Sequence, residues 1–152
     1  FGDARGLVAA LALGADGVNM GTRFMCTAES PIHHNIKQAI VDGNELGTEL
    51  IFRSLHNTAR VASNAVSREV VAILKGGGQF GDVMELVAGS RGRKVFEDGD
   101  PDAGIWTVGT VMGLIDDIPT CGELVSRMVT EAEEIITGRL GGMVTADARV
   151  LA

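Results

Sequence analysis

The stretch of this sequence best suited to chemistry is Gly-Val-Asn-Met-Gly-Thr-Arg-Phe, at residues 17–24. Residues 17–20 have the composition of a short strand, and Gly21-Thr22 would follow at its carboxyl end. Backbone N–H groups, a threonine hydroxyl and the start of a helical turn can together bind phosphate, and a glycine lets the ligand approach closely. From spacing alone, however, an ordinary tight turn after a strand carries more weight.

Other reactive side chains have an ordinary structural explanation. The histidines lack the H-E-x-x-H spacing of metal ligands, and no base is identifiable beside the first cysteine. The residues concerned are His33, His34, Cys26, Arg53, Arg60, Trp106 and 97–102. We expect the two arginines to form ion pairs and the tryptophan to lie in the core. The acidic run 97–102 is expected to be solvated, because it lacks the ligand order of an EF-hand. We predict no catalytic residue and no metal ligand among them.

We expect one helix before and one helix after the Gly21-Thr22 turn. The first covers residues 3–14, with Asp3 as its cap, and its many apolar residues predict that it is mostly buried. The second covers residues 31–41 and begins after Ser30-Pro31. A helix, a tight turn and a short strand form the end of a βαβ unit, whose parallel neighbours would precede Phe1. We therefore expect the chain to be part of a longer protein.

The remaining pattern predicts a smaller α/β region and a final helix. A Thr120/Glu123 capping box begins that helix, which is expected to end near Gly138 and to pack back on the first part of the chain. The predicted domains are 1–43, 44–118 and 119–152. Between the first and last domains we expect strands at 48–55 and 57–62, helices at 67–75 and 80–88, loops at 91–94 and 97–102, and a closely packed apolar helix at 107–115.

Composition limits the class of protein. The sequence is 45% hydrophobic with a mean hydropathy of +0.21, which is enough to form one core. A chain of 152 residues is too short for a complete (β/α)8 barrel. A net charge of −7 argues against nucleic acid as a partner. Two isolated cysteines and the lack of a long apolar run predict a cytoplasmic protein without a membrane span.

The run from Gly2 to Phe24 resembles the seventh helix and eighth strand of the nitronate monooxygenase family, formerly called 2-nitropropane dioxygenases. Residues 53–61, 104–106 and 113–117 resemble a bacterial branch of that family that includes NADH:quinone reductases. The resemblance therefore covers nearly the whole chain. It implies an α/β fold made of the C-terminal portion of a TIM (β/α)8 barrel plus a small α/β second domain.

The resemblance also implies a cofactor, FMN. Carried over residue by residue, Gly21 and Thr22 would bind its phosphate, with Met20 and Gly2 as further candidates. A Gly-Gly pair that completes this site in the family would lie just before Phe1. The family's active-site histidine lies on an earlier barrel strand, so no catalytic residue is assigned and the chain alone is expected to be inactive.

The implied activity is the oxidation of alkyl nitronates with O2 to a carbonyl compound and nitrite. NADH:quinone reduction and enoyl-thioester reduction are alternatives on the same scaffold, because the pocket that separates these substrates lies mostly upstream. A non-catalytic α/β fragment is the alternative of another class. In that case, unpaired apolar surface would drive aggregation or formation of a homo-oligomer.

Overall fold

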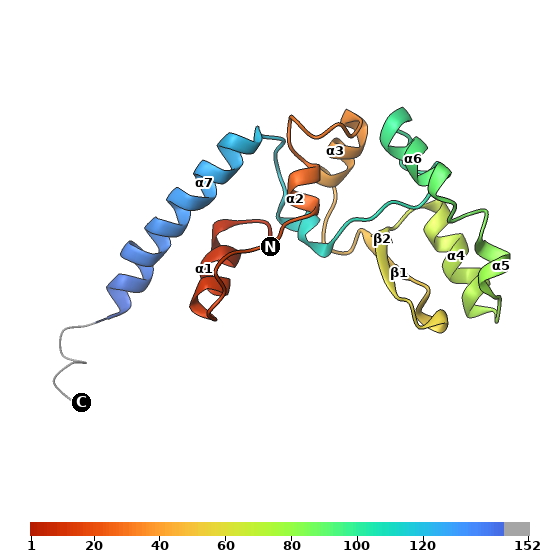
Figure 1. Cartoon of the computed structure of the whole chain (residues 1–152), viewed down its shortest axis with the longest axis horizontal. Helices are drawn as coiled ribbons and strands as arrows, with labels where there is room; N and C mark the ends of the chain where they lie inside the picture. Colours follow the sequence, from red (N-terminus) through yellow and green to blue (C-terminus); the bar gives the residue numbers. More distant parts are fainter. Residues whose placement is uncertain (145–152) are drawn as a thin grey trace.

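The computed structural model describes residues 1–144, which form a mixed α/β structure rich in short helices (Figure 1). The described sheet is a single antiparallel pair. The helices are α1 (Ala4–Ala12), α2 (Thr22–Met25), α3 (His34–Val41), α4 (Ala65–Lys75), α5 (Phe80–Val83), α6 (Gly89–Asp98) and α7 (Cys121–Glu134), and the strands are β1 (Thr48–Ile51) and β2 (Ala59–Ala62). Short 3-10 turns are η1 (Arg53–Leu55), η2 (Thr110–Leu114) and η4 (Gly141–Met143), and η3 (Ile135–Leu140) is a π-helical continuation of α7.

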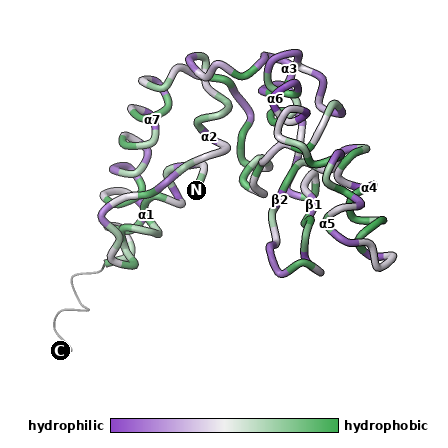
Figure 2. The backbone as a smooth tube through the Cα atoms, turned by 45° about the vertical axis from the view of Figure 1, so that its right-hand side comes forward, coloured by the Kyte–Doolittle hydropathy of each residue, from purple (hydrophilic) through white to green (hydrophobic). Residues whose placement is uncertain are grey.

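The chain has an elongated shape. Helices α1 and α7 lie at one end, the β1–β2 hairpin with α4 and α5 lies at the other, and α2, α3 and η2 lie between them (Figure 1). The same separation of the two ends is visible in the rotated view of Figure 2. No helix of the described residues is both long enough and apolar enough to cross a membrane.

Three apolar clusters hold these parts together. The central cluster joins the α2–α3 region to the later segment that passes through Trp106, Val108 and η2. The second lies between the hairpin and α4, around Ile51 and Val70. The third is small and packs α7 against α1 through Ala4, Val8 and Ala132. The central cluster therefore includes residues from both the first and the second sequence-predicted domain.

Several local predictions are confirmed. The Asp3 carboxylate accepts a hydrogen bond from the Gly6 N–H at 3.0 Å and so caps α1. Gly14 follows that helix with a φ of +93°, a conformation that favours glycine. The Thr120/Glu123 capping box begins α7. β1 and β2 pair in antiparallel register, with Thr48 opposite Ala62.

The first helix is less buried than predicted, and the strand after it is not formed. Leu13 is 89% exposed and Leu11 is 40% exposed, so only one side of α1 is covered, by α7. Residues 17–20 pair with no described strand. A strand requires a neighbour for its ladder of hydrogen bonds, and an apolar sequence alone does not supply that neighbour.

Other element boundaries also differ from prediction. The strand expected at 48–55 ends at Ile51, the helix expected at 80–88 ends at Val83, and the only helical element of 107–115 is the 3-10 turn η2. Helix α3 begins at His34, because the His33 side chain accepts the Asn35 N–H and caps the helix three residues after Ser30. Residues 91–94 and 97–98 lie inside helix α6 and not in loops. The glycines of α6 disfavour a helix, but its Val95 is fully buried in the central cluster, and this packing outweighs the weak local propensity.

Candidate functional site

Gly21 and Thr22 lie where the chain turns into α2. Gly21 is exposed, and a Cβ atom added there would meet no atom within 4 Å. Thr22 is only 8% exposed, and its Oγ1 accepts a hydrogen bond from the Gly109 N–H at 2.9 Å. The backbone at Gly21 is therefore open to a ligand, while the Thr22 side chain is held in place from the other side.

The donor set at this turn fits a phosphate group. The first N–H groups of a helix have no partner within that helix, so those at the start of α2 are available to an anion. The Thr22 hydroxyl accepts one bond from Gly109 and retains its own proton to donate. Arg23 takes no part, because its guanidinium is turned inward and the residue is 2% exposed.

The two further candidates, Gly2 and Met20, differ in how deeply they are buried. Met20 is half-buried and directly precedes the open glycine. Gly2 is buried, and a Cβ atom there would lie 2.5 Å from Cγ2 of Val111. A Cβ atom at Gly109 would meet both Val111 and the Thr22 hydroxyl. The 109–111 segment therefore contacts both Gly2 and Thr22. In the sequence this segment stands out only by Gly109 and Gly113 in an apolar run.

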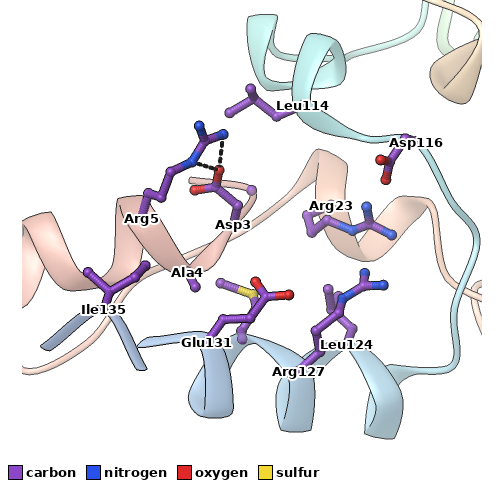
Figure 3. A pocket seen from close by; sticks show the side chains of 12 residues that line it. Asp3, Ala4, Arg5, Arg23, Leu114, Asp116, Leu124, Arg127, Glu131 and Ile135 are labelled. Carbon is purple, nitrogen blue, oxygen red and sulfur yellow. Dashed lines mark hydrogen bonds and ion pairs between the residues drawn. The ribbon is translucent and has the colours of Figure 1, made fainter. Parts of the chain in front are cut away.

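Gly2 also lines a cavity of about 360 Å³ between α1, α7 and the chain after η2 (Figure 3). Charged side chains of both signs surround it. On one wall Arg5 bonds Asp3 through Nε at 2.6 Å. Burial opposes ionisation of Asp3, but bonds from the Gly6 N–H and Arg5 lower the pKa of its carboxyl. The charges near this wall are thus already paired.

Asp117 joins two further arginines beside that cavity. The Nη2 atom of Arg23 lies 3.0 Å from its Oδ1, and the Nη1 atom of Arg127 lies 2.6 Å from its Oδ2. The hydrogen bond from Arg127 lowers the pKa of Asp117, and the positive charge of both arginines adds to this shift. Through Asp117, which precedes α7, the arrangement links Arg23 of α2 to Arg127 in the middle of α7, and it is structural in character. Only Nε of Arg23 is left without a partner among the described buried atoms.

Comparison with known proteins identifies the family of the chain. The family described as nitronate monooxygenase matches residues 1–131. The chain belongs to the nitronate monooxygenase family.

Relatives of this family member include enzymes with different names. A (3aS,4S,5R,7aS)-5-hydroxy-7a-methyl-1-oxo-octahydro-1H-indene-4-carboxyl-CoA dehydrogenase of Mycobacterium tuberculosis is 30% identical over 87% of the chain and 47% of the relative. A nitronate monooxygenase of Neurospora crassa is 29% identical over 88% of the chain and 36% of the relative. The structure of FabK from Thermotoga maritima is 30% identical with a TM-score of 0.87, over 95% of the chain and 45% of that structure. The chain thus spans less than half the length of these proteins.

The remaining reactive side chains of this family member lie outside the Gly21-Thr22 turn. Cys26 is fully buried, and burial raises the pKa of its thiol, so it stays protonated at neutral pH and is a poor nucleophile. Trp106 is a core residue whose Nε1 donates to the Pro101 carbonyl at 3.2 Å. Arg53 and Arg60 form no ion pair with a described carboxylate, against expectation. In the described residues no cluster of three His, Cys, Asp or Glu is placed to hold a metal ion.

Proposed function

We propose that this chain supplies part of the phosphate site of an FMN-dependent oxidoreductase of the nitronate monooxygenase type, built on a TIM barrel. The observation that supports this most directly is the Gly21-Thr22 turn, which is open at its backbone in a chain that matches the family over residues 1–131. Gly2 and Met20 complete the proposed set from the same region.

In the proposed site, the residues that this chain supplies contact the phosphate end of FMN. The N–H groups at the start of α2 and the Thr22 hydroxyl would hold the dianion, and the absence of a side chain at Gly21 would let it approach. Gly109 fixes the orientation of that hydroxyl. FMN, when bound, supplies the redox chemistry by which an alkyl nitronate and O2 give a carbonyl compound and nitrite. Since the proposed residues contact the phosphate and none of them contacts the reacting atoms, we expect the 152-residue chain alone to show no turnover.

Thioester redox chemistry is the second candidate. It is favoured by the carboxyl-CoA dehydrogenase name of the relatives from Mycobacterium tuberculosis and Rhodococcus jostii, which are 30% and 31% identical to the chain. NADH:quinone reduction rests only on the sequence resemblance. Assays of the whole protein with an alkyl nitronate, with an enoyl-CoA, and with NADH plus a quinone would separate the three.

The test of the site is a titration of the purified chain with FMN, followed by flavin absorbance and fluorescence. We expect saturable binding that weakens at least about tenfold in Gly21→Ala, because a methyl group would occupy the approach to the N–H groups. That variant keeps its fold, since the new Cβ meets nothing and the backbone is right-handed helical. Gly17→Ala is the matched control, because its added Cβ also meets nothing.

Thr22 is tested by a pair of substitutions. Thr22→Ser keeps the hydroxyl and should bind FMN like the parent, whereas Thr22→Ala should bind it weakly. Circular dichroism checks that the alanine variant still folds after the Gly109 N–H loses its acceptor. If Gly21→Ala bound FMN as well as Gly17→Ala does, the proposed phosphate site would be wrong.

A further inference from the structure

The β1–β2 hairpin and α4 lie at the end of the molecule opposite α1 and α7 (Figure 1). Residues of both line a small apolar cavity. Its volume is about 270 Å³. Its apolar wall consists of Leu50 and Phe52 from the hairpin and Val71 and Leu74 from α4. A pocket of this kind accepts an alkyl chain or an aromatic ring.

The other side chains at this cavity include two cations. Arg53 lies on η1 and Lys75 is the last residue of α4, and both are exposed. Neither forms an ion pair with any carboxylate in the part of the chain that the structure describes. No acidic residue lines the cavity, although the whole chain has a net charge of −7. The α4 dipole accounts for Lys75 at a helix end, but it gives no reason for Arg53.

The backbone on either side of η1, which carries Arg53, has an unusual conformation. Phe52 and His56, on either side of η1, have φ values of 60° and 54°, which side-chain-bearing residues rarely adopt. The Phe52 ring packs against Phe80 with ring centroids 6.1 Å apart. The Phe52 ring is therefore held by its packing against Phe80, and the exposed Arg53 side chain follows it directly in the chain.

We propose that this cavity binds an amphipathic carboxylate, with its alkyl or aryl body against Leu50, Phe52 and Val71 and its carboxylate at Arg53 and Lys75. Apolar walls with two unpaired cations complement such a molecule in both shape and charge. None of the residues proposed for the flavin phosphate lines this cavity. The inference therefore stands or falls independently of flavin binding.

The test uses octanoate as the probe and the complete chain, followed by amide chemical shifts in NMR spectra. We expect saturable shifts confined to residues 50–55 and 71–75. The Arg53→Gln/Lys75→Gln double variant should bind at least about tenfold more weakly, and added salt should weaken binding to the parent chain. The matched control is Arg93→Gln/Lys94→Gln, which removes two exposed cations of α6 outside the cavity.

Two further probes separate the parts of the ligand. Acetate has the charge without the apolar body, and octylamine has the body with the opposite charge. Binding of octanoate alone supports the proposal. Equal binding of acetate or octylamine, shifts centred on α1 and α7, or unchanged octanoate affinity in the Arg53/Lys75 variant would overturn it. The variant's own spectrum shows whether the fold is retained.

Discussion

Lys37 shows how one residue can organise the loop that follows the candidate site. It is 6% exposed, and its Nζ donates to the carbonyl oxygens of Thr27, Ala28 and Ser30 at 2.6, 3.3 and 2.8 Å. Three carbonyls pointing at one ammonium replace the water that burial removes. The side chain therefore fixes the loop between α2 and α3 from the helix that follows it.

Replacing this lysine should be costly. In Lys37→Met three carbonyls lose their donor, and we expect the free energy of unfolding to fall by about 2–4 kcal/mol. Urea denaturation followed by circular dichroism measures this change. Gln38→Met, at the exposed neighbouring position, is the control and should change stability by less than about 1 kcal/mol. Similar losses in both variants would mean that the three hydrogen bonds contribute little.

At the residue scale, the sequence indicates candidate residues but not their tertiary partners. The resemblance to the family selects Gly21 and Thr22, and the donor set of a Gly-Thr turn is compatible with a phosphate; their role stays a prediction. The hydrogen bond from the Gly109 N–H to the Thr22 hydroxyl could not be predicted from local sequence, since 87 positions separate the two residues. The inward turn of Lys37 was equally hidden, because local patterning favours lysine at the surface.

Among the elements, those with local signals were predicted and those that depend on tertiary contacts were not. The Asp3 cap and the Thr120/Glu123 capping box each involve residues three apart, so they can be read from the sequence. Helix α6 depends on Val95 entering the central cluster, a contact that no local window contains. The strand expected at 17–20 fails for a related reason, because a strand needs a pairing partner and residues 17–20 pair with no described strand.

The ion pairs of Asp117 with Arg23 of α2 and Arg127 of α7 predict how stability depends on pH. The pKa of Asp117 is lowered from its ordinary value of 3.8 by Arg127 and Arg23. A carboxyl with a lowered pKa in the folded state stabilises that state above its ordinary pKa, and the contribution is lost as pH falls through the folded value. We therefore expect stability to decrease as pH falls below about 3.8, measured as the urea midpoint.

Asp117→Asn isolates this contribution. At pH 7 the buried Arg23 would lose its carboxylate, and we expect a loss of about 1–3 kcal/mol, since Asp117 is itself partly exposed. The fall in stability below pH 4 should be shallower in the variant than in the parent. Asp116→Asn is the control, because Asp116 is exposed and forms none of the ion pairs in the described chain. A parent and variant with parallel pH profiles would contradict the proposed role.

The whole molecule is held together unevenly. A central cluster links the middle of the chain to later segments, but the cluster between α1 and α7 has only three buried residues, Ala4, Val8 and Ala132. Large apolar residues remain exposed at the end of α1 and on α7, including Leu13 at 89% and Val125 and Val129 at 47% each. Apolar surface of this kind tends to be covered by another surface.

Self-association of the chain is the consequence we expect at this scale. Val125, Val129 and Ile136 recur at helical spacing along α7 and its continuation, so they present one apolar face. Sedimentation velocity at increasing concentration should show dimers or larger species in the micromolar range. Val125→Glu/Val129→Glu should shift the chain to monomer while Leu124 and Met128 keep the helix packed.

Ser126→Glu/Thr130→Glu is the control. It adds the same charge at exposed positions that are already polar, and should leave association nearly unchanged. If both double variants dissociated equally, general repulsion and not the apolar face would explain the effect, and a monomeric parent would remove the basis for the face altogether.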